Sequence, residues 1–487
     1  MQHLSEIVAD IGLDVQLSGN AACVLNGITS DSRKVREGML FVAIPGHAAN
    51  GEQFIDDAIA KGASAILTQQ PYSGQKVTWI SVGNVRLAVA KIAAAFYGEQ
   101  PQHIVAITGT NGKTSTAEFY RQICQLAGQH SASIGTLGLR STSASLNARY
   151  PGVNTSPDPI LMAEMLRQLV EHHIQYAALE ASSHGLDQHR LDGVKLEAAA
   201  FTNLTRDHLD YHPSMDAYFD AKSRLFLDLE LSSNAAVINV DDGYGAKLAR
   251  RCEAAGRRVV SYGATAQDIV LKRVVPSEKG LRMDVVWDGE SCEFVAPVFG
   301  AFQAMNLCAA MGLARESGFS KEQIVAAVSS LSGVHGRMQY VASHPCGAPM
   351  FVDYAHTPDA LKVVLEGLRA HTQRRLCVVF GCGGDRDKGK RPQMGEVAAR
   401  YADMVVVTDD NPRSENPAEI RQQIMNAAPG AREIGDRRKA IVEAVKQLGA
   451  GDVLVVAGKG HENYQIIGEQ TIHFDDAEII KEALSSL

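Results

Sequence analysis

A short glycine-rich segment stands between an apolar run and a helical pattern near residue 110. Residues 109–114 read Gly-Thr-Asn-Gly-Lys-Thr and follow the apolar run 104–108. Glycine allows the tight turn that aims several backbone N–H groups at one anion, and the start of the following helix and Lys113 add positive charge. Thr114 offers a hydroxyl suited to Mg²⁺. We therefore predict a phosphate-binding loop between a strand and a helix.

The length of this loop narrows the class of protein. Only Asn111 and Gly112 separate Thr110 from Lys113, so the segment is shorter than the general pattern G-x-x-x-x-G-K-[ST]. This difference points away from the common GTPases and toward a narrower group of ATP-using enzymes. The alternative is an ordinary glycine-rich turn, which the order of strand, loop, Lys-Thr and helix makes the weaker interpretation.

Ionisable side chains cluster in the next part of the chain. Glu180 and His184 follow an apolar run, and residues 202–212 read Thr-Asn-Leu-Thr-Arg-Asp-His-Leu-Asp-Tyr-His. A carboxylate at a strand end can hold Mg²⁺ beside the phosphate loop, although Glu180 could instead cap the next helix and His184 could be an ordinary turn residue. So dense a cluster as 202–212 indicates a functional site. Lys222 can lie on the same helix face as apolar neighbours, which is unusual for a lysine. The alternative explanation is snorkelling, in which the stem lies on the apolar surface and the ammonium group reaches solvent.

Three further polar loops follow apolar runs in the last third of the chain. Residues 381–392 combine glycines with basic side chains, residues 409–413 read Asp-Asp-Asn-Pro-Arg, and residues 458–462 read Gly-Lys-Gly-His-Glu. The first composition suits an anion, and an arginine held beside a proline suits bidentate binding of a carboxylate. Each loop alone could be a surface turn, but three of them on successive strands indicate a binding site.

Short apolar strands must position these loops. We predict strands at residues 40–46, 64–68, 104–108, 176–179, 198–201, 235–238, 350–352, 376–380, 404–407 and 453–456. Continuous apolar runs are typical of parallel strands that are covered on both faces. In open α/β sheets ligands bind beyond the carboxyl ends of the strands. Two nucleotide-fold-like domains would thus present their polar loops to a shared cleft.

The length of the chain, 487 residues, suggests about three domains. A strand–helix–strand unit precedes a polar linker at 97–101, and another block begins near Arg337. We place the domains at 1–98, 99–336 and 337–487. The expected fold class is α/β, with a small N-terminal domain, a central P-loop-type ATPase domain with a mostly parallel sheet, and a C-terminal Rossmann-like domain.

Composition and charge limit the partners and the compartment. The formal net charge is −8, whereas a sequence-independent nucleic-acid binder is usually basic. The 8 cysteines include no C-x-x-C pair, which favours reduced thiols. We find no signal segment and no apolar run near the ~20 residues that span a bilayer. We expect a cytoplasmic protein, a monomer, without nucleic acid or membrane insertion.

At this point the sequence resembles the Mur ligases, the ATP-dependent amide-forming enzymes of peptidoglycan synthesis, over all three blocks. The resemblance implies ATP and Mg²⁺ as cofactors. The ATP-binding positions that it implies are Gly109, Thr110, Asn111, Gly112, Lys113, Thr114, Ser115, Asn306, Arg337, Asp353 and His356. It also implies metal binding by Thr114, Glu180, His208 and Lys222, the last as a carbamate. Lys113, His208 and Lys222 would be the catalytic residues.

Within that family the chain is similar to members that add meso-diaminopimelate to UDP-N-acetylmuramoyl-L-alanyl-D-glutamate. The implied diaminopimelate contacts are Arg391, Asp410, Asn411, Pro412, Arg413, Gly458 and Glu462. The chemistry agrees with this, because diaminopimelate differs from lysine by a carboxylate at its far end. A buried Arg413 would pair with that carboxylate, and lysine would leave the arginine unpaired. Lysine-adding relatives would need an acidic pocket instead.

The other substrate would lie along a third set of residues. The resemblance implies contacts to the UDP-linked substrate by Ser30, Ser32, His47, Ala48, Ala49, Asn154, Thr155, Ser156, Ser182, Gln188 and Arg190. Ser156 stands where family members often have a second threonine, so the hydroxyl is kept.

The reaction implied by the family begins with transfer of the γ-phosphoryl group of ATP to the γ-carboxylate of D-glutamate. The diaminopimelate amine then attacks the acyl phosphate, and phosphate leaves. The same residues allow two other functions to be compared with this one. A folylpolyglutamate synthetase would share the loop and the amide chemistry, but the N-terminal block and residues 410–413 argue against it. A non-enzymatic nucleotide switch would need no amino-acid pocket.

Overall fold

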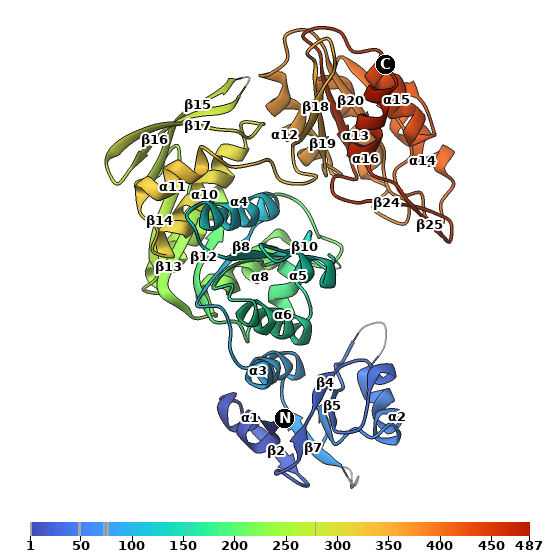
Figure 1. Cartoon of the computed structure of the whole chain (residues 1–487). Helices are drawn as coiled ribbons and strands as arrows, with labels where there is room; N and C mark the ends of the chain where they lie inside the picture. The colour runs from blue at the N-terminus through green and yellow to red at the C-terminus, as the bar shows by residue number, and fades with distance from the viewer. Residues whose placement is uncertain (1, 47–49, 72–73, 75–76, 153, 278) are drawn as a thin grey trace. The chain divides into compact units, whose positions relative to one another are not determined.

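The computed structural model describes residues 2–46, 50–71, 74, 77–152, 154–277 and 279–487 (Figure 1). The chain forms two compact units. The first comprises residues 1–261 and 309–319, and the second comprises residues 262–308 and 320–487. The domain boundaries predicted from the sequence at 98 and 336 stay predictions.

A small mixed sheet begins the first unit. Its order is β2 (Val15–Ser18), β7 (Thr78–Val82), β6 (Ala65–Thr68), β5 (Met39–Val42) and β4 (Gly27–Thr29), and only β2 runs antiparallel to its neighbour. Side chains of β5 alternate between two cores, with Leu40 and Val42 on one face and Phe41 on the other. The predicted strand–helix–strand unit is confirmed by β5, α2 (Ile55–Ala60) and β6.

Short elements and two helices complete this region. They are β1 (Gln2–His3), α1 (Leu4–Asp10), β3 (Val24–Leu25), the 3₁₀ turns Ser32–Lys34 and Gly51–Phe54, and α3 (Val85–Tyr97). Helices α1 and α3 contribute Leu4, Ile7 and Val89 to the core that also holds Leu40 and Val42. Asn84 caps α3 by accepting a hydrogen bond from the Leu87 N–H group. The helix ends at Tyr97, where the sequence predicts a linker.

The second sheet of this unit carries the phosphate-loop segment. Its order is β10 (Gly138–Ser141), β9 (Ser131–Gly135), β11 (Tyr176–Glu180), β8 (His103–Thr108), β12 (Leu196–Phe201), β13 (Leu231–Asn239) and β14 (Arg258–Gly263). The four predicted strands are confirmed as β8, β11, β12 and β13. The chain leaves β8 toward β9 on one side and later returns to β12 on the other side. The carboxyl end of β8 is therefore the switch point at which such sheets bind ligands.

Helices connect these strands. They are α4 (Lys113–Leu126), α5 (Ala144–Arg149), α6 (Pro159–Glu171), α7 (Ser183–Asp187), α8 (Met215–Leu227) and α9 (Gly243–Ala254). The N-cap side chains of Asp158, Ser214 and Asp242 accept backbone hydrogen bonds, which explains where α6, α8 and α9 begin. Apolar side chains such as Ile104, Leu166 and Phe219 join in one core.

The second unit holds an antiparallel meander of β15 (Ile269–Ser277), β16 (Gly280–Trp287) and β17 (Glu290–Ala296). These three strands are not among those predicted from the sequence. The signal was the alternation of Leu281, Met283, Val285 and Trp287, which are buried on one face of β16, a period-two pattern rather than an apolar run. Helix α10 (Gln303–Glu316) begins in this unit, and α11 (Lys321–Val328) follows it.

A six-stranded sheet forms the rest of the second unit. Its order is β18 (Gln339–Ser343), β19 (Pro349–Asp353), β23 (Val453–Ala457), β20 (Leu376–Phe380), β21 (Met404–Val407) and β22 (Arg432–Glu433), and only β18 is antiparallel to its neighbour. The four strands predicted in this region are confirmed. A hairpin, β24 (Tyr464–Ile467) and β25 (Gln470–His473), follows β23.

Helices cover both faces of that sheet. They are α12 (Pro358–Arg369), α13 (Lys390–Tyr401), α14 (Pro417–Met425), α15 (Arg437–Lys446) and α16 (Asp476–Ser485). Val378 of β20 packs in the core with α12–α14, whereas its neighbour Val379 packs in the core with α15 and α16. The α/β fold class predicted from the sequence is confirmed.

Arg437 and Asp476 form a fully buried ion pair between α15 and α16, with 2.7 Å between Nη2 and Oδ2. We expect Asp476→Asn to lower the free energy of unfolding by about 3–5 kcal/mol, because it leaves a buried guanidinium without its counter-charge. Urea denaturation would measure the change. The matched control is Glu482→Gln, which breaks the exposed Arg438–Glu482 pair between the same helices and should change little. Equal effects of both substitutions would contradict the prediction.

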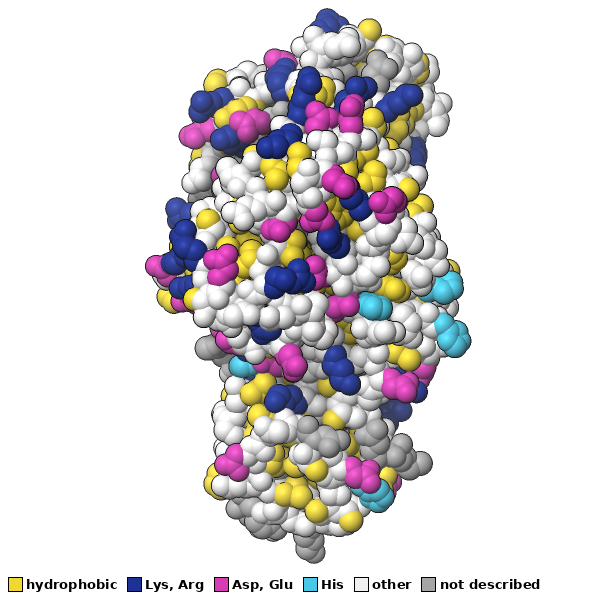
Figure 2. Space-filling model, turned by 90° about the vertical axis from the view of Figure 1, so that its left-hand side faces the viewer, with side chains coloured by type: hydrophobic (Ala, Val, Ile, Leu, Met, Phe, Trp, Pro, Cys, Tyr) yellow, Lys and Arg dark blue, Asp and Glu magenta, His cyan; other side chains and the backbone are white. Residues whose placement is uncertain are grey.

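The surface is mixed in charge on the face drawn in Figure 2, where acidic and basic side chains are interspersed. In the described ranges no helix is both long enough and apolar enough to cross a membrane.

Candidate functional site

The glycine-rich segment forms a tight loop between β8 and α4. Gly109 has φ +151°, and a Cβ atom placed on it would lie 1.9 Å from Thr202 Oγ1. The loop after β12 therefore packs directly against the loop after β8, and only glycine permits this approach. Asn203 completes the contact, because its carbonyl accepts from the Thr110 N–H group at 2.9 Å and its Oδ1 accepts from the Asn111 N–H group at 3.0 Å. Asn203 lies in the segment 202–212 that the sequence singles out, but its contact with the phosphate loop could not be predicted, because it depends on the pairing of β12 with β8.

Lys113 is the first residue of α4 and turns back over the loop. Its Nζ donates to the carbonyls of Gly109 and Thr110, each at 2.9 Å. The ammonium group is thus held at the loop itself, together with the positive end of α4. This arrangement can neutralise a bound phosphate chain.

Glu180, the last residue of β11, lies beside this loop and is buried. Its carboxylate accepts from Thr114 Oγ1 at 3.0 Å and from the N–H group and hydroxyl of Thr136 at 2.8 and 3.1 Å. The alternative that Glu180 caps the next helix is wrong, since Ser182 caps α7. In the part of the chain that is described, Glu180 forms no ion pair. A buried carboxylate beside a phosphate loop is a fitting oxygen ligand for Mg²⁺.

Lys222 projects from α8 to the same loop and is 1% exposed. Its Nζ donates to the Gly109 carbonyl at 2.8 Å and lies 4.6 Å from the centre of the Tyr218 ring. Snorkelling is therefore excluded as the explanation for this lysine. Burial, reinforced by the charge of Lys113, holds the pKa of Lys222 well below its usual range. The amine is thereby favoured in its neutral, nucleophilic form.

Three histidines gather between α7 and α8. The ring of His184 lies 5.0 Å from that of His208 and 5.7 Å from that of His212. Burial, with the nearby His208 and His212, lowers the pKa of His184 to about 4. Burial also lowers the pKa values of His208 and His212. Neutral imidazoles can accept a proton or a hydrogen bond.

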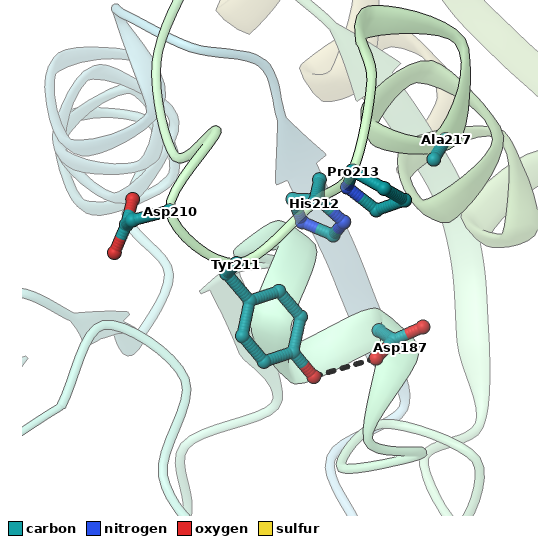
Figure 3. A pocket seen from close by; sticks show the side chains of 6 residues that line it. All are labelled: Asp187, Asp210, Tyr211, His212, Pro213 and Ala217. Carbon is teal, nitrogen blue, oxygen red and sulfur yellow. Dashed lines mark hydrogen bonds between the residues drawn. The ribbon is translucent and has the colours of Figure 1, made fainter.

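A pocket of about 470 Å³ opens beside these histidines (Figure 3). It is lined by Asp187, Asp210, Tyr211, His212, Pro213 and Ala217. The Tyr211 hydroxyl donates to Asp187 at 2.6 Å. His208 belongs to the same loop as Asp210, Tyr211 and His212, and its backbone has the left-handed angle φ +52°. Such a strained conformation is common at functional sites.

The predicted metal set is brought together only in part. Thr114 and Glu180 are in direct contact, and Lys222 contacts the same loop through Gly109. Among the described residues, His208 forms no hydrogen bond to Glu180, and no three His, Cys, Asp or Glu side chains are gathered into a metal site. Mg²⁺ commonly uses one or two carboxylates with water and substrate phosphates, so an all-protein cage is not required.

Five of the eleven positions expected to contact the UDP-linked substrate form one network beside Glu180: Thr155, Ser156, Ser182, Gln188 and Arg190. Ser156 Oγ donates to the Glu180 carbonyl at 2.8 Å and lies 3.0 Å from Ser182 Oγ. Arg190 donates to the carbonyl of Ser156 and to Gln188 Oε1. The hydroxyl of Thr155 lies 3.1 Å from that of Thr136. Of these two residues, only Thr155 was predicted from the sequence.

The remaining positions of that set stand apart from this network. Ser30 and Ser32 follow β4 in the small mixed sheet, where the Ser32 carbonyl accepts from Lys61. Asn154 precedes the network in the chain. His47, Ala48 and Ala49 lie outside the described residues.

In the second unit, Asp353 and Arg337 gather around Tyr354. The buried Asp353 carboxylate accepts from the N–H groups of Met338 and Ala355, and burial raises its pKa. The Arg337 guanidinium lies 4.2 Å from the centre of the Tyr354 ring. His356 Nδ1 lies 2.9 Å from the Tyr354 carbonyl. An arginine stacked on an aromatic ring is suited to contact a nucleotide.

Asn306, also in the second unit, lies on α10, where its amide donates to Gln303 at 2.8 Å.

The loops after β21 and β23 meet across the end of β20, which lies between these strands. Gly458 has φ +114°, and a Cβ there would lie 2.6 Å from Asp410 Oδ2. Asn411 Nδ2 donates to Glu462 Oε2 at 2.8 Å. The predicted set Asp410, Asn411, Gly458 and Glu462 is thus assembled into one acidic cluster that can receive an ammonium group.

Arg413 ends the same loop in a left-handed conformation, φ +52°. Its backbone pairs with Ile466 of β24, and Nη1 donates to the Gly384 carbonyl at 2.9 Å. Pro412, which precedes it, is buried. A half-buried guanidinium thus stands on the same loop as Asp410 and Asn411, and an arginine there suits a ligand that carries a carboxylate as well as an ammonium group.

Arg391 is placed differently from Arg413. Its side chain is fully buried, and its two terminal nitrogens pair with Glu415 and Gln423. Glu415 was not singled out from the sequence. Direct contact of Arg391 with a ligand stays a prediction.

The fold and these loops define a class of ATP-dependent ligase, and the chain belongs to the Mur ligase family. Three family models match it: the catalytic domain of the family at residues 24–97, the Mur ligase middle domain at 107–314, and the glutamate ligase domain at 336–460. The family resemblance seen in the motifs is confirmed.

Particular relatives share nearly the whole chain. The UDP-N-acetylmuramoyl-L-alanyl-D-glutamate–2,6-diaminopimelate ligase of Mesorhizobium japonicum is 48% identical over 97% of both chains. The ligase of the same name from Caulobacter vibrioides is 48% identical over 95% of this chain and 96% of its own. A solved structure of a ligase with this name matches with a TM-score of 0.70 and 35% identity over 95% of both chains.

Proposed function

We propose that this chain is an ATP-dependent ligase that joins meso-diaminopimelate to UDP-N-acetylmuramoyl-L-alanyl-D-glutamate in peptidoglycan precursor synthesis. The observation that carries the proposal is the loop 410–413. It carries Asp410 and Asn411 of the acidic cluster together with Arg413, the combination of acid and arginine that an amino acid with a second, distant carboxylate needs. The ligases of M. japonicum and C. vibrioides, which bear this activity in their names, support it.

The residues around the phosphate loop suit activation of a carboxylate. Lys113 would neutralise the phosphates while the γ-phosphoryl group passes from ATP to the γ-carboxylate of D-glutamate, forming an acyl phosphate and ADP. The neutral amine of diaminopimelate then attacks the acyl carbon and forms the C–N bond. Inorganic phosphate leaves with the electron pair of the broken C–O bond and takes up the proton that the nitrogen loses. His208, whose pKa is lowered by burial, would serve the phosphates by donating its ring N–H group to a phosphate oxygen.

Thr114 and Glu180 are the residues that we propose to hold Mg²⁺. Their oxygens are in contact, and Glu180 is a buried carboxylate without an ion-pair partner in the described ranges. When bound, Mg²⁺ supplies charge neutralisation of the phosphates. We propose Lys222, as a carbamate, for a second position.

One assay tests the function. Phosphate release should require the UDP-linked dipeptide, ATP, Mg²⁺ and meso-diaminopimelate, and L-lysine should not replace the diamino acid. Phosphate release with L-lysine but not with meso-diaminopimelate would overturn the role of Arg413. Phosphate release without either amino acid would favour a nucleotide hydrolase. Omitting Mg²⁺ with a chelator should stop the reaction.

Carbamylation of Lys222 makes a separate prediction. A neutral buried amine reacts with carbon dioxide, so the intact mass of gently handled protein should exceed the sequence mass by one carbon dioxide. Lys222→Ala should lack the addition and lose about 10²-fold or more in kcat. Short carboxylic acids should partly restore the activity, because they can supply the missing anion. An unmodified, fully active wild type would contradict the prediction.

The setting of the reaction belongs to the same proposal. The supply of ATP and of a nucleotide-linked substrate points to the cytoplasm. We propose a monomer whose partners are these small molecules, without nucleic acid and without membrane insertion, and light scattering after size exclusion would test the oligomeric state.

A further inference from the structure

Lys459 is a fully buried lysine in the loop after β23. Its Nζ donates to Asn411 Oδ1 at 3.1 Å and lies 3.5 Å from Glu462 Oε2. The ring centre of Tyr464 lies 5.5 Å away. A buried ammonium group is unfavourable unless it is paired, so these contacts account for its position. The proposed reaction, as described so far, gives Lys459 no role.

The contacts of Lys459 determine how Asn411 is oriented. Asn411 Oδ1 accepts from Lys459 and also from the Ile466 N–H group at 3.0 Å. Two donors at one atom identify it as the oxygen, which turns the amide nitrogen toward Glu462 at 2.8 Å. Lys459 therefore holds both Asn411 and the carboxylate that Asn411 contacts.

Lys459 also places a cation 3.5 Å from Glu462, which lies close to a second acid, Asp410. Burial, and then Asp410, raise the pKa of Glu462, while Lys459 and the Asn411 amide oppose this increase. The charged and titratable groups that face Glu462 are Asp410, Lys459, Tyr464, Tyr354 and Arg437. Without Lys459, Glu462 would take up a proton at higher pH and lose its attraction for an ammonium group.

We propose that Lys459 is a positioning residue for the amino-acid substrate, holding Asn411 and the ionised Glu462 in the arrangement that receives the ammonium group of the diamino acid. This inference rests on the proposed function. It assigns to Lys459 no contact with the substrate itself. It predicts that the charge of Lys459 affects the binding of the amino acid and leaves the binding of ATP unaffected.

Two substitutions separate geometry from charge. Lys459→Met removes both the hydrogen bond to Asn411 and the positive charge. We expect the KM for meso-diaminopimelate to rise about tenfold or more, with the KM for ATP unchanged. Lys459→Gln can still donate to Asn411 and should give a smaller increase. In both variants the acid limb of kcat/KM for diaminopimelate, followed between about pH 6 and 9, should move to higher pH. The matched control is Lys439→Met, an exposed lysine on α15, which should change none of these values.

A double variant connects the effect to Glu462. In the Glu462→Gln background, Lys459→Met should no longer move the acid limb, because the group whose protonation it controls is gone. An unchanged KM and pH profile in folded Lys459→Gln would overturn the inference, as would equal increases in the KM values of ATP and diaminopimelate. If Lys459→Met does not fold, Lys459→Gln and the pH profile decide. Failure of the wild type to use diaminopimelate would instead overturn the proposed function.

Discussion

Replacing Lys113 with alanine is expected to lower kcat about 10³-fold, the largest loss that we expect from a single substitution. Lys113 holds a full positive charge against the Gly109 and Thr110 carbonyls, at the start of α4. In phosphoryl transfer the protein contributes mainly positioning and charge neutralisation. Lys222, the other lysine at this loop, has a pKa well below its usual range because it is buried, so it is a poor substitute for the charge of Lys113. Phosphate release under saturating substrates measures the loss.

The comparison for Lys113→Ala is Lys247→Ala, which replaces a half-buried lysine on α9 of the same unit that pairs with Asp216. It should retain wild-type activity. Binding of the UDP-linked substrate, measured by calorimetry without ATP, should be unchanged by Lys113→Ala, because the proposed contacts of that substrate lie elsewhere. A Lys113→Ala variant that keeps most of its activity would refute the phosphate-binding role of the loop.

Replacing Arg413 with methionine is expected to lower kcat/KM for meso-diaminopimelate by about 10²–10³-fold, because a bidentate pair with a carboxylate contributes two charge-assisted hydrogen bonds. The residue already occupies the left-handed region, φ +52°, so methionine meets the same backbone as arginine. The value for L-lysine, which lacks the second carboxylate, should hardly change. The ratio of the two substrates is therefore the measurement.

Arg413→Lys and Arg432→Met complete the series. Lysine keeps the charge without the planar fork and should give an intermediate loss. Arg432 is an exposed arginine on β22 of the same unit, and its replacement should leave the ratio unchanged. An equal loss for both amino acids in Arg413→Met would show that the loop was disturbed, and would contradict recognition of the distant carboxylate by Arg413.

Much of the fold could be predicted because the parallel strands are continuous apolar runs. The strands β8, β11, β20 and β23 are buried on both faces, and their composition alone distinguishes them from the loops that follow. The meander β15–β17 was missed for the opposite reason. It has one buried face, and its alternating pattern is weaker than an apolar run.

The parts of the candidate site that could be predicted are those made of residues that follow one another in the sequence. The phosphate loop was recognised from its spacing, whereas Thr136 and Glu415 were missed because their partners are distant in the sequence. For the same reason the segment 202–212 was recognised without the contact of Asn203 with the phosphate loop. Arg391 shows the same limit. Its charge is visible in the sequence, but its pairing with Glu415 and Gln423 depends on how α13 and α14 pack.

The sequence by itself determined the class of chemistry, since the order of strand, Gly-Thr-Asn-Gly-Lys-Thr and helix is a local property of consecutive residues. Alternatives that depended on burial were decided only by the tertiary structure. Ser182 caps α7 and leaves Glu180 for the phosphate loop, and α8 packing buries Lys222 against Gly109. Strand order brings residues 410–413 and 458–462 together. Burial and long-range contact arise from packing, and packing changes the charge and reactivity of side chains whose types the sequence already names.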